Sequence, residues 1–274
     1  MSDPRLTPAN ARVAAAHLPD APAGVQRVTG TGAQVAIPVA DLRRAPEGAR
    51  DRQVLFGEVL TVYETRAGWS FVQAQKDGYV GYVLADALVP ERSATHWVAA
   101  PATHVYSEAN LKSPERLMLC FGSRITGLSE QNGFLETPDG FIPVQHVSPL
   151  SRTYSDPVEI AAKFLGVPYL WGGNSWLGID CSGLVQAALL ACGIPCPGDS
   201  DLQQTALGTA QDPGTEPQRN DLLFWRGHVA LVVGPETLIH ANAFHMATAY
   251  EPLQPALERI ATQGDGPVTS HIRL

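Results

Sequence analysis

The stretch Asp180–Val185 reads Asp-Cys-Ser-Gly-Leu-Val and opens a segment in which apolar residues recur at helical spacing as far as Gly193. This pattern predicts a helix over about 180–192 that ends at the glycine. Cys181 then lies in the first turn, where unpaired N–H groups and the helix dipole stabilise a thiolate. Most cysteines are buried structural residues. Here a Gly-rich approach over 169–174 leads to a helix start whose amides can also donate to an oxyanion, which favours a nucleophilic Cys181.

Two histidines, His228 and His240, follow in sequence that alternates as strands do, over 222–225, 229–233 and 237–241. If Val233 pairs with Thr237 across a three-residue loop, His240 lies opposite Ala230, on the same face as His228. A loop of two or four residues would place the two rings on opposite faces. A cysteine nucleophile, a histidine base and a polar residue that orients the base form the arrangement of thiol peptidases.

Helical patterns lie on both sides of these strands. Ser155 or Asp156 can cap a helix with Pro157 in its first turn. The apolar stripe of that helix is formed by Ile160, Ala161, Phe164 and Leu165. A further helix begins over 253–260, and a closing strand is expected over 268–274. Helices followed by a meander of strands are typical of the α+β class.

An internal repeat occupies residues 33–150. Phe56-Gly57 matches Phe121-Gly122 at a spacing of 65, and Asp77-Gly78 matches Asp139-Gly140 at a spacing of 62. Each copy reads as short strands separated by turn residues, which predicts two tandem β modules. The Ala- and Pro-rich residues before them predict an arm with a short helix over 8–17. The expected domains are therefore an arm over 1–30, β modules over 31–92 and 93–150, and a catalytic domain over 151–274.

Composition limits the class of protein. The chain has 274 residues, 45% apolar and 17% charged, which is typical of a globular protein. Its net charge of −8 and scattered basic residues argue against a nucleic-acid partner. No apolar run approaches the ~18 residues needed to span a membrane. The first twenty residues do not resemble an export signal, and four cysteines do not form a disulfide scaffold, so we expect a cytoplasmic location.

Residues 156–245 resemble the NlpC/P60 cysteine peptidases, which cut cell-wall peptides. The resemblance runs through five ordered segments, 168–173, 180–185, 221–225, 227–234 and 239–241. It implies a papain-like α+β catalytic domain in which Cys181 is the nucleophile and His228 is the general base and then the acid. By the same resemblance, His240 orients His228, and Tyr169 lies by the scissile carbonyl.

The repeat resembles bacterial SH3-like modules, most clearly in its first copy, which implies two small SH3-like β-barrels ahead of the catalytic domain. That architecture resembles peptidases that hydrolyse the γ-D-glutamyl to diamino-acid bond of murein peptides with a free N-terminal L-Ala, in cell-wall peptide recycling. The resemblance implies that the alanine amine faces Glu58, Tyr79, Asp180 and Ser182. An ammonium in a closed site needs carboxylate and other oxygen acceptors, and a closed end rejects N-acylated peptides.

The repeat bears on this assignment because the second copy has Ser123 in place of Glu58 and Phe141 in place of Tyr79. The module fold therefore does not require the polar pair. Without the resemblance, Glu58 can equally be a solvated hairpin charge and Tyr79 a surface aromatic residue.

The sequence departs from the family pattern at two places. Arg219-Asn220 replaces a Pro-Gly turn, and the loop Gly198–Asp201 lacks an arginine expected near position 198. The second departure leaves open how the substrate carboxylates are bound and which diamino acid is preferred. Cys192 and Cys196 lack two further patterned ligands for zinc, so we expect no metal and no cofactor. A monomer is favoured.

Two alternatives stay open at the level of the sequence. The same Cys/His/His triad could serve an amidase or acyltransferase that acts on an N-acyl substrate. Alternatively, SH3-like modules often bind peptidoglycan, so the chain could be a non-catalytic wall-binding protein.

Overall fold

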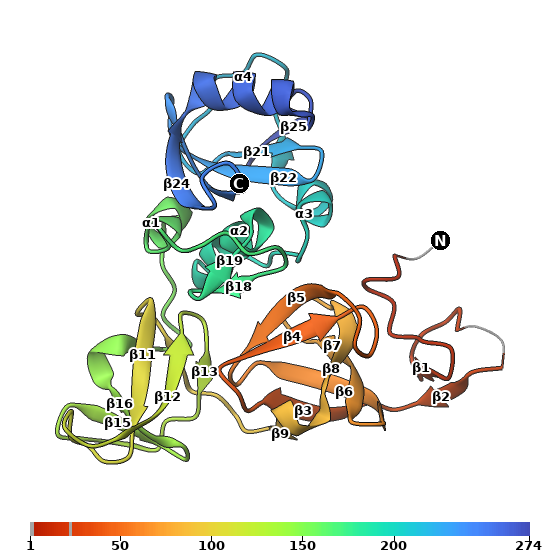
Figure 1. Ribbon diagram of the computed structural model, residues 1–274, viewed down its shortest axis with the longest axis vertical. Helices are drawn as coiled ribbons and strands as arrows, with labels where there is room; N and C mark the ends of the chain where they lie inside the picture. Colours follow the sequence, from red (N-terminus) through yellow and green to blue (C-terminus); the bar gives the residue numbers. More distant parts are fainter. Residues whose placement is uncertain (1–2, 22–23) are drawn as a thin grey trace. The chain divides into compact units, whose positions relative to one another are not determined.

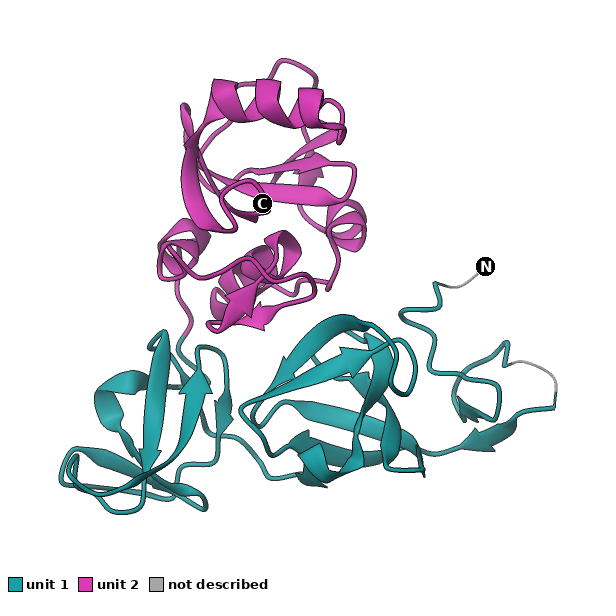
Figure 2. Cartoon of the chain, in the orientation of Figure 1, with its two compact units in different colours: residues 1–152 teal, residues 153–274 magenta. Residues whose placement is uncertain are grey.

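The structure is a computed structural model that describes residues 3–21 and 24–274. The chain forms two compact units, residues 1–152 and residues 153–274 (Figures 1 and 2). The described part of unit 1 is built of strands and short 3-10 turns, whereas unit 2 combines strands with four α-helices. Within the described ranges, no helix is long and apolar enough to cross a membrane. Parts of the predicted arm, residues 1–2 and 22–23, lie outside the described residues.

The first β module of unit 1 is a seven-stranded antiparallel sheet in the order β5-β4-β8-β7-β6-β3-β9 (Figure 1). Alternate residues point into its core, where Leu42, Leu60 and Val72 are almost fully buried. This alternation is what strands with one buried face require. The elements are β3 Thr31–Val35, β4 Val39–Arg43, β5 Arg50–Leu55, β6 Val59–Arg66, β7 Trp69–Ala74, β8 Val80–Leu84, the 3-10 turn Ala85–Ala87 and β9 Leu88–Pro90.

The second β module repeats these strand pairings in two sheets, β12-β11-β16-β15-β14 and β13-β10-β17. The pairs β11–β12, β11–β16 and β15–β16 correspond to β4–β5, β4–β8 and β7–β8 of the first module. The long β6 is represented by two short strands, β13 and β14. The elements are β10 His96–Val98, β11 Ala102–Tyr106, β12 Glu115–Cys120, β13 Arg124–Ile125, β14 Ser129–Gln131, β15 Phe134–Thr137, β16 Gly140–Pro143, the 3-10 turn Val144–His146 and β17 Val147–Pro149.

Turn glycines explain why the repeat is visible in the sequence. Gly57 and Gly122 have φ of 73° and 90°, and Gly68 and Gly133 have φ of 80° and 77°. Residues with a side chain rarely adopt these left-handed conformations. The two copies therefore share glycine where their chains turn in the same way.

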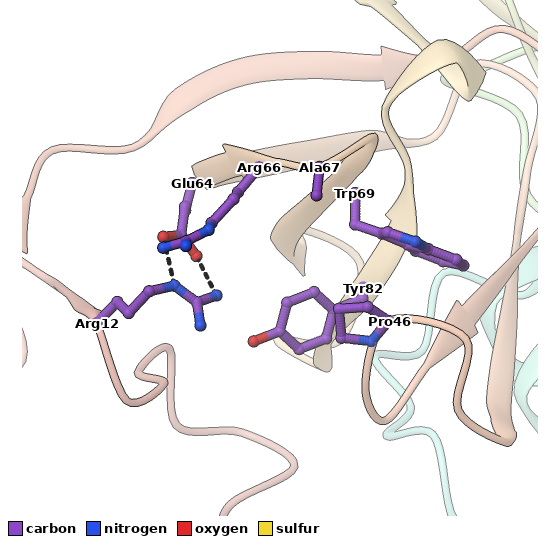
Figure 3. A pocket seen from close by; sticks show the side chains of 7 residues that line it. All are labelled: Arg12, Pro46, Glu64, Arg66, Ala67, Trp69 and Tyr82. Atoms are coloured by element: carbon purple, nitrogen blue, oxygen red, sulfur yellow. Dashed lines mark hydrogen bonds and ion pairs between the residues drawn. The ribbon is translucent and has the colours of Figure 1, made fainter.

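The prediction of a helix over 8–17 is wrong. Strand β1, Val13–Ala15, pairs in parallel with β2, Gln26–Val28. The Asn10 side chain accepts hydrogen bonds from the backbone N–H groups of the second and third residues after it, a local turn that competes with helix formation. The arm also lies against the first module, because Arg12 and Glu64 form an ion pair of 2.6 Å at a cavity (Figure 3). That cavity is lined by Arg12, Pro46, Glu64, Arg66, Ala67, Trp69 and Tyr82.

Unit 2 contains a six-stranded sheet in the order β20-β25-β21-β22-β23-β24. Helices α1 and α2 pack against β22 and β23, and α4 packs on the sheet through Leu253, Ala256 and Ile260 (Figure 1). The elements are α1 Pro157–Ala162, β18 Asn174–Ser175, β19 Gly178–Ile179, α2 Cys181–Ala191, α3 Ser200–Ala206, β20 Thr209–Ala210, β21 Leu222–Trp225, β22 His228–Gly234, β23 Thr237–Asn242, β24 Ala247–Pro252, α4 Leu253–Gln263 and β25 Ser270–Arg273.

Most predicted elements of unit 2 are confirmed, including α2, the three strands β21 to β23 and the start of α4. Asp156 is the N-cap of α1 and accepts a hydrogen bond from the N–H of Val158. The predicted apolar stripe runs past the end of the helix, because α1 ends at Ala162; of the two members beyond it, Phe164 is buried and Leu165 is exposed. Helix α3 and strand β24 were not predicted.

Candidate active site

The start of α2 is built around Asp180, the residue before Cys181. One Asp180 oxygen accepts hydrogen bonds from the Gly183 N–H at 2.6 Å and the Ser182 hydroxyl at 3.0 Å. The other accepts from the Gly172 N–H in the approach loop at 3.0 Å. Asp180 thereby fixes both the loop and the first helical turn, as an N-cap does. Cys181 and its neighbours are almost fully buried at this helix start.

The glycine of the Asp-Cys-Ser-Gly motif has a packing reason. A Cβ atom on Gly183 would lie 2.4 Å from the carbonyl oxygen of Gly173. The approach loop therefore passes closer to the helix than any side chain at this position would allow. This contact, together with the Asp180 cap, holds Cys181 at the helix terminus, where the N–H groups favour negative charge.

His228 and His240 lie side by side on neighbouring strands of the sheet. Their Nε2 and Nδ1 atoms are 2.9 Å apart, and the ring planes are inclined by 56°. The indole ring of Trp225 lies 5.6 Å from the His228 ring, centroid to centroid, at the end of the preceding strand. Because His240 is only 1% exposed, its hydrogen bonds are made inside the protein rather than to bulk water.

The hairpin that carries the histidines has the predicted register but a different turn. Leu231 pairs with Ile239, which is the register that brings the two rings to one face. Gly234 pairs with Thr237, so the loop has two residues instead of the predicted three. A bulge at Val233 takes up the extra residue. Without this bulge, the two-residue loop would shift the register and separate the rings.

Two residues that the sequence did not identify complete this cluster, Glu251 on β24 and Arg259 on α4. Glu251 Oε2 lies 2.9 Å from Nε2 of His240. The Arg259 guanidinium donates to both Glu251 oxygens, at 2.9 and 2.7 Å. The sequence offered no signal for Glu251 because β24 was not predicted, and its pairing with β23 is what brings the carboxylate to His240.

Burial and neighbouring charges set the ionisation of the cluster. Burial, with smaller contributions from His240 and the Arg259 cation, lowers the pKa of His228 to about 3, against an opposite effect of Glu251. Burial also lowers the pKa of His240, although Glu251 opposes this. For Glu251, burial raises the pKa, but hydrogen bonds from His240 and Arg259 outweigh it and lower the pKa to about 2. Both imidazoles are therefore neutral and Glu251 is ionised at neutral pH.

Tyr169 is half-buried, and its backbone is fixed by a hydrogen bond from its N–H to the carbonyl of Met246. Burial raises the pKa of its phenol, and negative charge on Cys181 and Asp180 raises it further. The phenol is thus a proton-bearing donor near these two residues at any ordinary pH.

Glu58 and Tyr79 lie in unit 1, whereas the other predicted site residues lie in unit 2. Glu58 Oε1 pairs with Nζ of Lys76 at 2.9 Å, and its side chain is 12% exposed. Its second oxygen, Oε2, is buried and accepts no hydrogen bond from the described residues. Glu58 is therefore not a solvated hairpin charge. Tyr79 is 3% exposed and packs in the core of the first module, so the alternative of a surface aromatic residue is wrong.

The structure accounts for the first departure from the family pattern and shows the surroundings of the second. Asn220 has φ of 73°, so it adopts the conformation expected of glycine in that turn. Arg219 forms an ion pair with Asp156, the N-cap of α1, at 2.7 Å. The Gly198–Asp201 loop leads into α3, where the buried Gln203 donates to the carbonyls of Ser182 and Pro197 at 2.9 and 3.0 Å. This loop therefore supports the start of α2.

One cluster brings possible metal ligands together, because ligand atoms of His240, His245 and Glu251 lie within 4.8 Å of one another. Arg259 holds both oxygens of this Glu251, so a metal cation would meet a guanidinium charge. His245 Nδ1 lies 3.0 Å from the side-chain oxygen of Asn242. The donor set suits an ion pair with hydrogen-bonded imidazoles better than a metal.

A cysteine at a helix start and a hydrogen-bonded histidine pair on the strands packed against that helix define a class, the papain-like thiol peptidases. Comparison with known proteins narrows the class. Residues 166–257 match the NlpC/P60 family, and residues 42–88 match the bacterial dipeptidyl-peptidase Sh3 domain.

Two relatives are similar over most of the chain. A γ-D-glutamyl-L-lysine dipeptidyl-peptidase of Bacillus subtilis (strain 168) is 30% identical over 216 residues, 69% of this chain and 71% of the relative. A protein of the same name from Bacillus cereus is 27% identical over 244 residues, 74% of this chain and 70% of the relative. A solved NlpC/P60 family protein from Bacillus cereus shares the fold, with a TM-score of 0.75 at 21% identity over 89% of this chain and 99% of that one. The chain belongs to the NlpC/P60 family and is a cysteine peptidase.

Proposed function

We propose that this peptidase hydrolyses the γ-D-glutamyl to diamino-acid bond of murein peptides that begin with a free L-Ala, in the recycling of cell-wall peptides. The observation that carries the proposal is the length of the similarity to the Bacillus subtilis γ-D-glutamyl-L-lysine dipeptidyl-peptidase. That similarity covers 69% of the chain, more than either unit alone contains, so it includes parts of both units.

The proposed chemistry uses Cys181 as the nucleophile. His228 removes the thiol proton, and the sulfur attacks the γ-carbonyl carbon of the D-glutamyl residue. The backbone N–H groups at the start of α2 and the protonated Tyr169 phenol stabilise the oxyanion. The C–N bond then breaks, and the leaving amine takes the proton from His228. Water, deprotonated by His228, hydrolyses the thioester and returns free Cys181.

Glu58 is the proposed partner of the substrate ammonium. Its Oε2 is a buried carboxylate oxygen that accepts no hydrogen bond from the described residues, an arrangement that costs free energy unless a ligand satisfies it. Lys76 binds the other oxygen, Oε1, so Oε2 can accept a hydrogen bond from the substrate ammonium. The acceptor is specific to the first module, since the second has Ser123 at the equivalent position.

Tyr79, Asp180 and Ser182 are proposed to complete the amine site. Asp180 Oδ2 accepts one hydrogen bond, from Gly172, and a carboxylate oxygen can accept a second. The Ser182 hydroxyl donates to the other Asp180 oxygen, and a hydroxyl oxygen can also accept a hydrogen bond from an ammonium.

The test compares L-Ala-γ-D-Glu-L-Lys with its N-acetylated form, using purified wild-type protein and the Cys181→Ala variant. We expect wild-type protein to cleave the free peptide at least about tenfold faster than the blocked one, because the blocked amine carries no charge for Glu58. Preference for the blocked peptide would favour the amidase or acyltransferase alternative. Binding to insoluble murein without cleavage of either peptide, and without alkylation of Cys181, would favour the non-catalytic alternative.

We further propose that residues 31–92 and 93–150 are both SH3-like modules, which their corresponding strand pairings support. The division into an arm, two modules and a catalytic domain can be tested by limited proteolysis, which should cut near residues 30, 92 and 152. A cytoplasmic location and a monomeric state stay predictions, to be checked by cell fractionation and by light scattering.

A further inference from the structure

A chain of hydrogen bonds leads from His228 to Arg259 through two buried groups. His228 Nε2 lies 2.9 Å from His240 Nδ1, and His240 Nε2 lies 2.9 Å from Glu251 Oε2. Arg259 closes the chain with two hydrogen bonds to Glu251. His240 and Glu251 are 1% and 6% exposed, so bulk water does not replace these partners. Each hydrogen bond of this chain therefore joins two protein side chains. The atom that carries each hydrogen can be deduced from the chemistry of the two partners.

The assignment begins at Glu251, because the Arg259 guanidinium always carries donors and never accepts. Facing two such donors, the carboxylate stays ionised, in agreement with its lowered pKa. An ionised carboxylate can only accept, so the hydrogen between Glu251 and His240 is on Nε2 of His240. Neutral His240 then has a lone pair on Nδ1, and the hydrogen of the next bond is on Nε2 of His228. The lone pair of neutral His228 is left on Nδ1.

We propose that Glu251, held by Arg259, is a positioning residue that sets the tautomers of both histidines and leaves Nδ1 of His228 as the basic nitrogen. This inference rests on the proposed function in one respect, that Cys181 and His228 act as nucleophile and base. It extends the triad to a fourth and a fifth residue, neither of which contacts the reacting atoms. When His228 takes the thiol proton, the imidazolium has a neutral acceptor in His240, which is itself stabilised by the carboxylate.

Two further contacts fix the position of the Arg259 side chain that binds Glu251. Its NH1 donates to the side chain of Gln263 at 2.9 Å, and its guanidinium lies 4.4 Å from the centroid of the Phe244 ring. The charged or titratable groups near Glu251 are thus His240 from β23, Arg259 from α4 and His245 from the loop before β24. None of them is a carboxylate, so nothing opposes the ionised form of Glu251 except burial.

The decisive variant is Glu251→Gln, which keeps the shape and removes the charge. The new amide can donate to Nε2 of His240, which moves the His240 hydrogen to Nδ1 and the His228 hydrogen to Nδ1 as well. We expect kcat/KM on the free tripeptide to fall about 100-fold or more, mainly through kcat. The matched control is Glu236→Gln, on an exposed turn of the same hairpin, which should leave both constants unchanged.

A second readout needs no substrate. The rate at which iodoacetamide alkylates Cys181 is followed against pH, in a Cys192→Ala background and on protein shown to be folded by its melting curve. In Glu251→Gln we expect the midpoint of this profile to move upward by about one pH unit or more, because His228 no longer accepts the thiol proton. Arg259→Gln should move it in the same direction by less.

The outcomes separate the inference from the proposed function. If the wild-type protein does not cleave the tripeptide but Glu251→Gln still shifts the alkylation midpoint, the positioning role of Glu251 stands and the proposed substrate is wrong. A Glu251→Gln variant with the wild-type midpoint overturns the inference, whether its activity is normal or has fallen only with its melting temperature. A wild-type profile with the midpoint of an ordinary free thiol also overturns it, since His228 would then not be the base.

Discussion

The two units hold their candidate site residues in different ways. In unit 2 the residues satisfy one another, from His228 through His240 to Glu251 and Arg259. In unit 1, Glu58 is held by Lys76 on one oxygen and keeps a buried, unsatisfied oxygen on the other. A hydrogen-bond network whose groups are all satisfied holds the catalytic side chains in one arrangement. A buried oxygen without a hydrogen bond is instead a suitable acceptor for a ligand. We therefore expect changes to Cys181 and to this network of unit 2 to affect every substrate, and changes at Glu58 to affect only substrates with a free amine.

The largest effect is expected at Cys181, because the variant should lose activity whatever the state of the substrate amine. Cys181→Ala should lower kcat/KM at least about 1,000-fold on free and blocked peptides alike, because both need the same nucleophile. The matched control is Cys192→Ala at the other end of α2, whose thiol has its pKa raised to about 11 by burial and by Asp156 and Glu159. That variant should keep full activity. Residual activity in Cys181→Ala above that of an untreated blank would remove the thiol from the mechanism.

The next effect concerns the stability of unit 2 rather than its chemistry. Asp221 is 1% exposed and accepts hydrogen bonds from His271 at 2.6 Å and from Arg273 at 3.0 and 2.8 Å. Asp221→Asn removes the charged acceptor of these hydrogen bonds and should lower the unfolding free energy by about 1–2 kcal/mol, measured by urea denaturation. The folded fraction should cleave peptide at the wild-type rate. A variant as stable as wild type would show that this ion pair contributes nothing to unit 2.

The same residue predicts how stability depends on pH. Burial raises the pKa of Asp221, but hydrogen bonds from Arg273, Gln218 and His271 outweigh it, so the net pKa is lowered. A lowered pKa means that the stabilisation is complete above the ordinary value near 4 and is lost as pH falls through the lowered one. Melting curves from pH 6 to pH 3 should show a smaller loss for Asp221→Asn than for wild type. Parallel curves would contradict the assignment.

A smaller and more selective effect is expected at Glu58. Glu58→Gln should reduce cleavage of the free-amine tripeptide about 10- to 100-fold, because the ammonium loses a charged acceptor. Cleavage of the N-acetylated peptide should change little, so the preference between the two peptides narrows. The control is Glu130→Gln, which neutralises an exposed carboxylate on β14 of the second module. Equal losses on both peptides would mean that Glu58 supports the fold and not the amine.

The smallest effect is expected at the equivalent position of the second module. Ser123 is fully buried, and its hydroxyl accepts or donates no hydrogen bond among the described residues. Ser123→Ala should leave activity unchanged and raise the unfolding free energy by up to about 1 kcal/mol, since it removes an unsatisfied polar group. A loss of activity in this variant would show that both modules, and not the first alone, serve the substrate.

The parts of the fold that the sequence predicts are those with short-range signals. Gly193 ends α2 with φ of 74°, and Asp156 caps α1 through its own side chain. Apolar alternation predicts β21 to β23, and the register of the hairpin brings the histidines together even though the bulge at Val233 was not foreseen. Such signals are carried by neighbouring residues and so can be read without the fold.

The parts that were missed depend on contacts between distant or weakly patterned segments. Strand β24 has the polar residues Thr248 and Glu251 at buried positions, so it lacks the apolar alternation that predicts a strand. The proposed role of Glu251 could therefore not be predicted from the sequence. Arg259 is recognisable only once α4 lies on the sheet next to that strand. The helix expected over 8–17 is absent because the Asn10 side chain and the pairing with β2 override local propensity.

The proposed cleavage after the γ-D-glutamyl residue is tested most directly by identifying the products. Wild-type protein is incubated with L-Ala-γ-D-Glu-L-Lys and with the corresponding diaminopimelate peptide, and the products are identified by mass spectrometry with chiral standards. We expect L-Ala-γ-D-Glu and the free diamino acid from wild-type protein and neither product from Cys181→Ala. Release of L-Ala, or cleavage of the blocked peptide in preference to the free one, would contradict it.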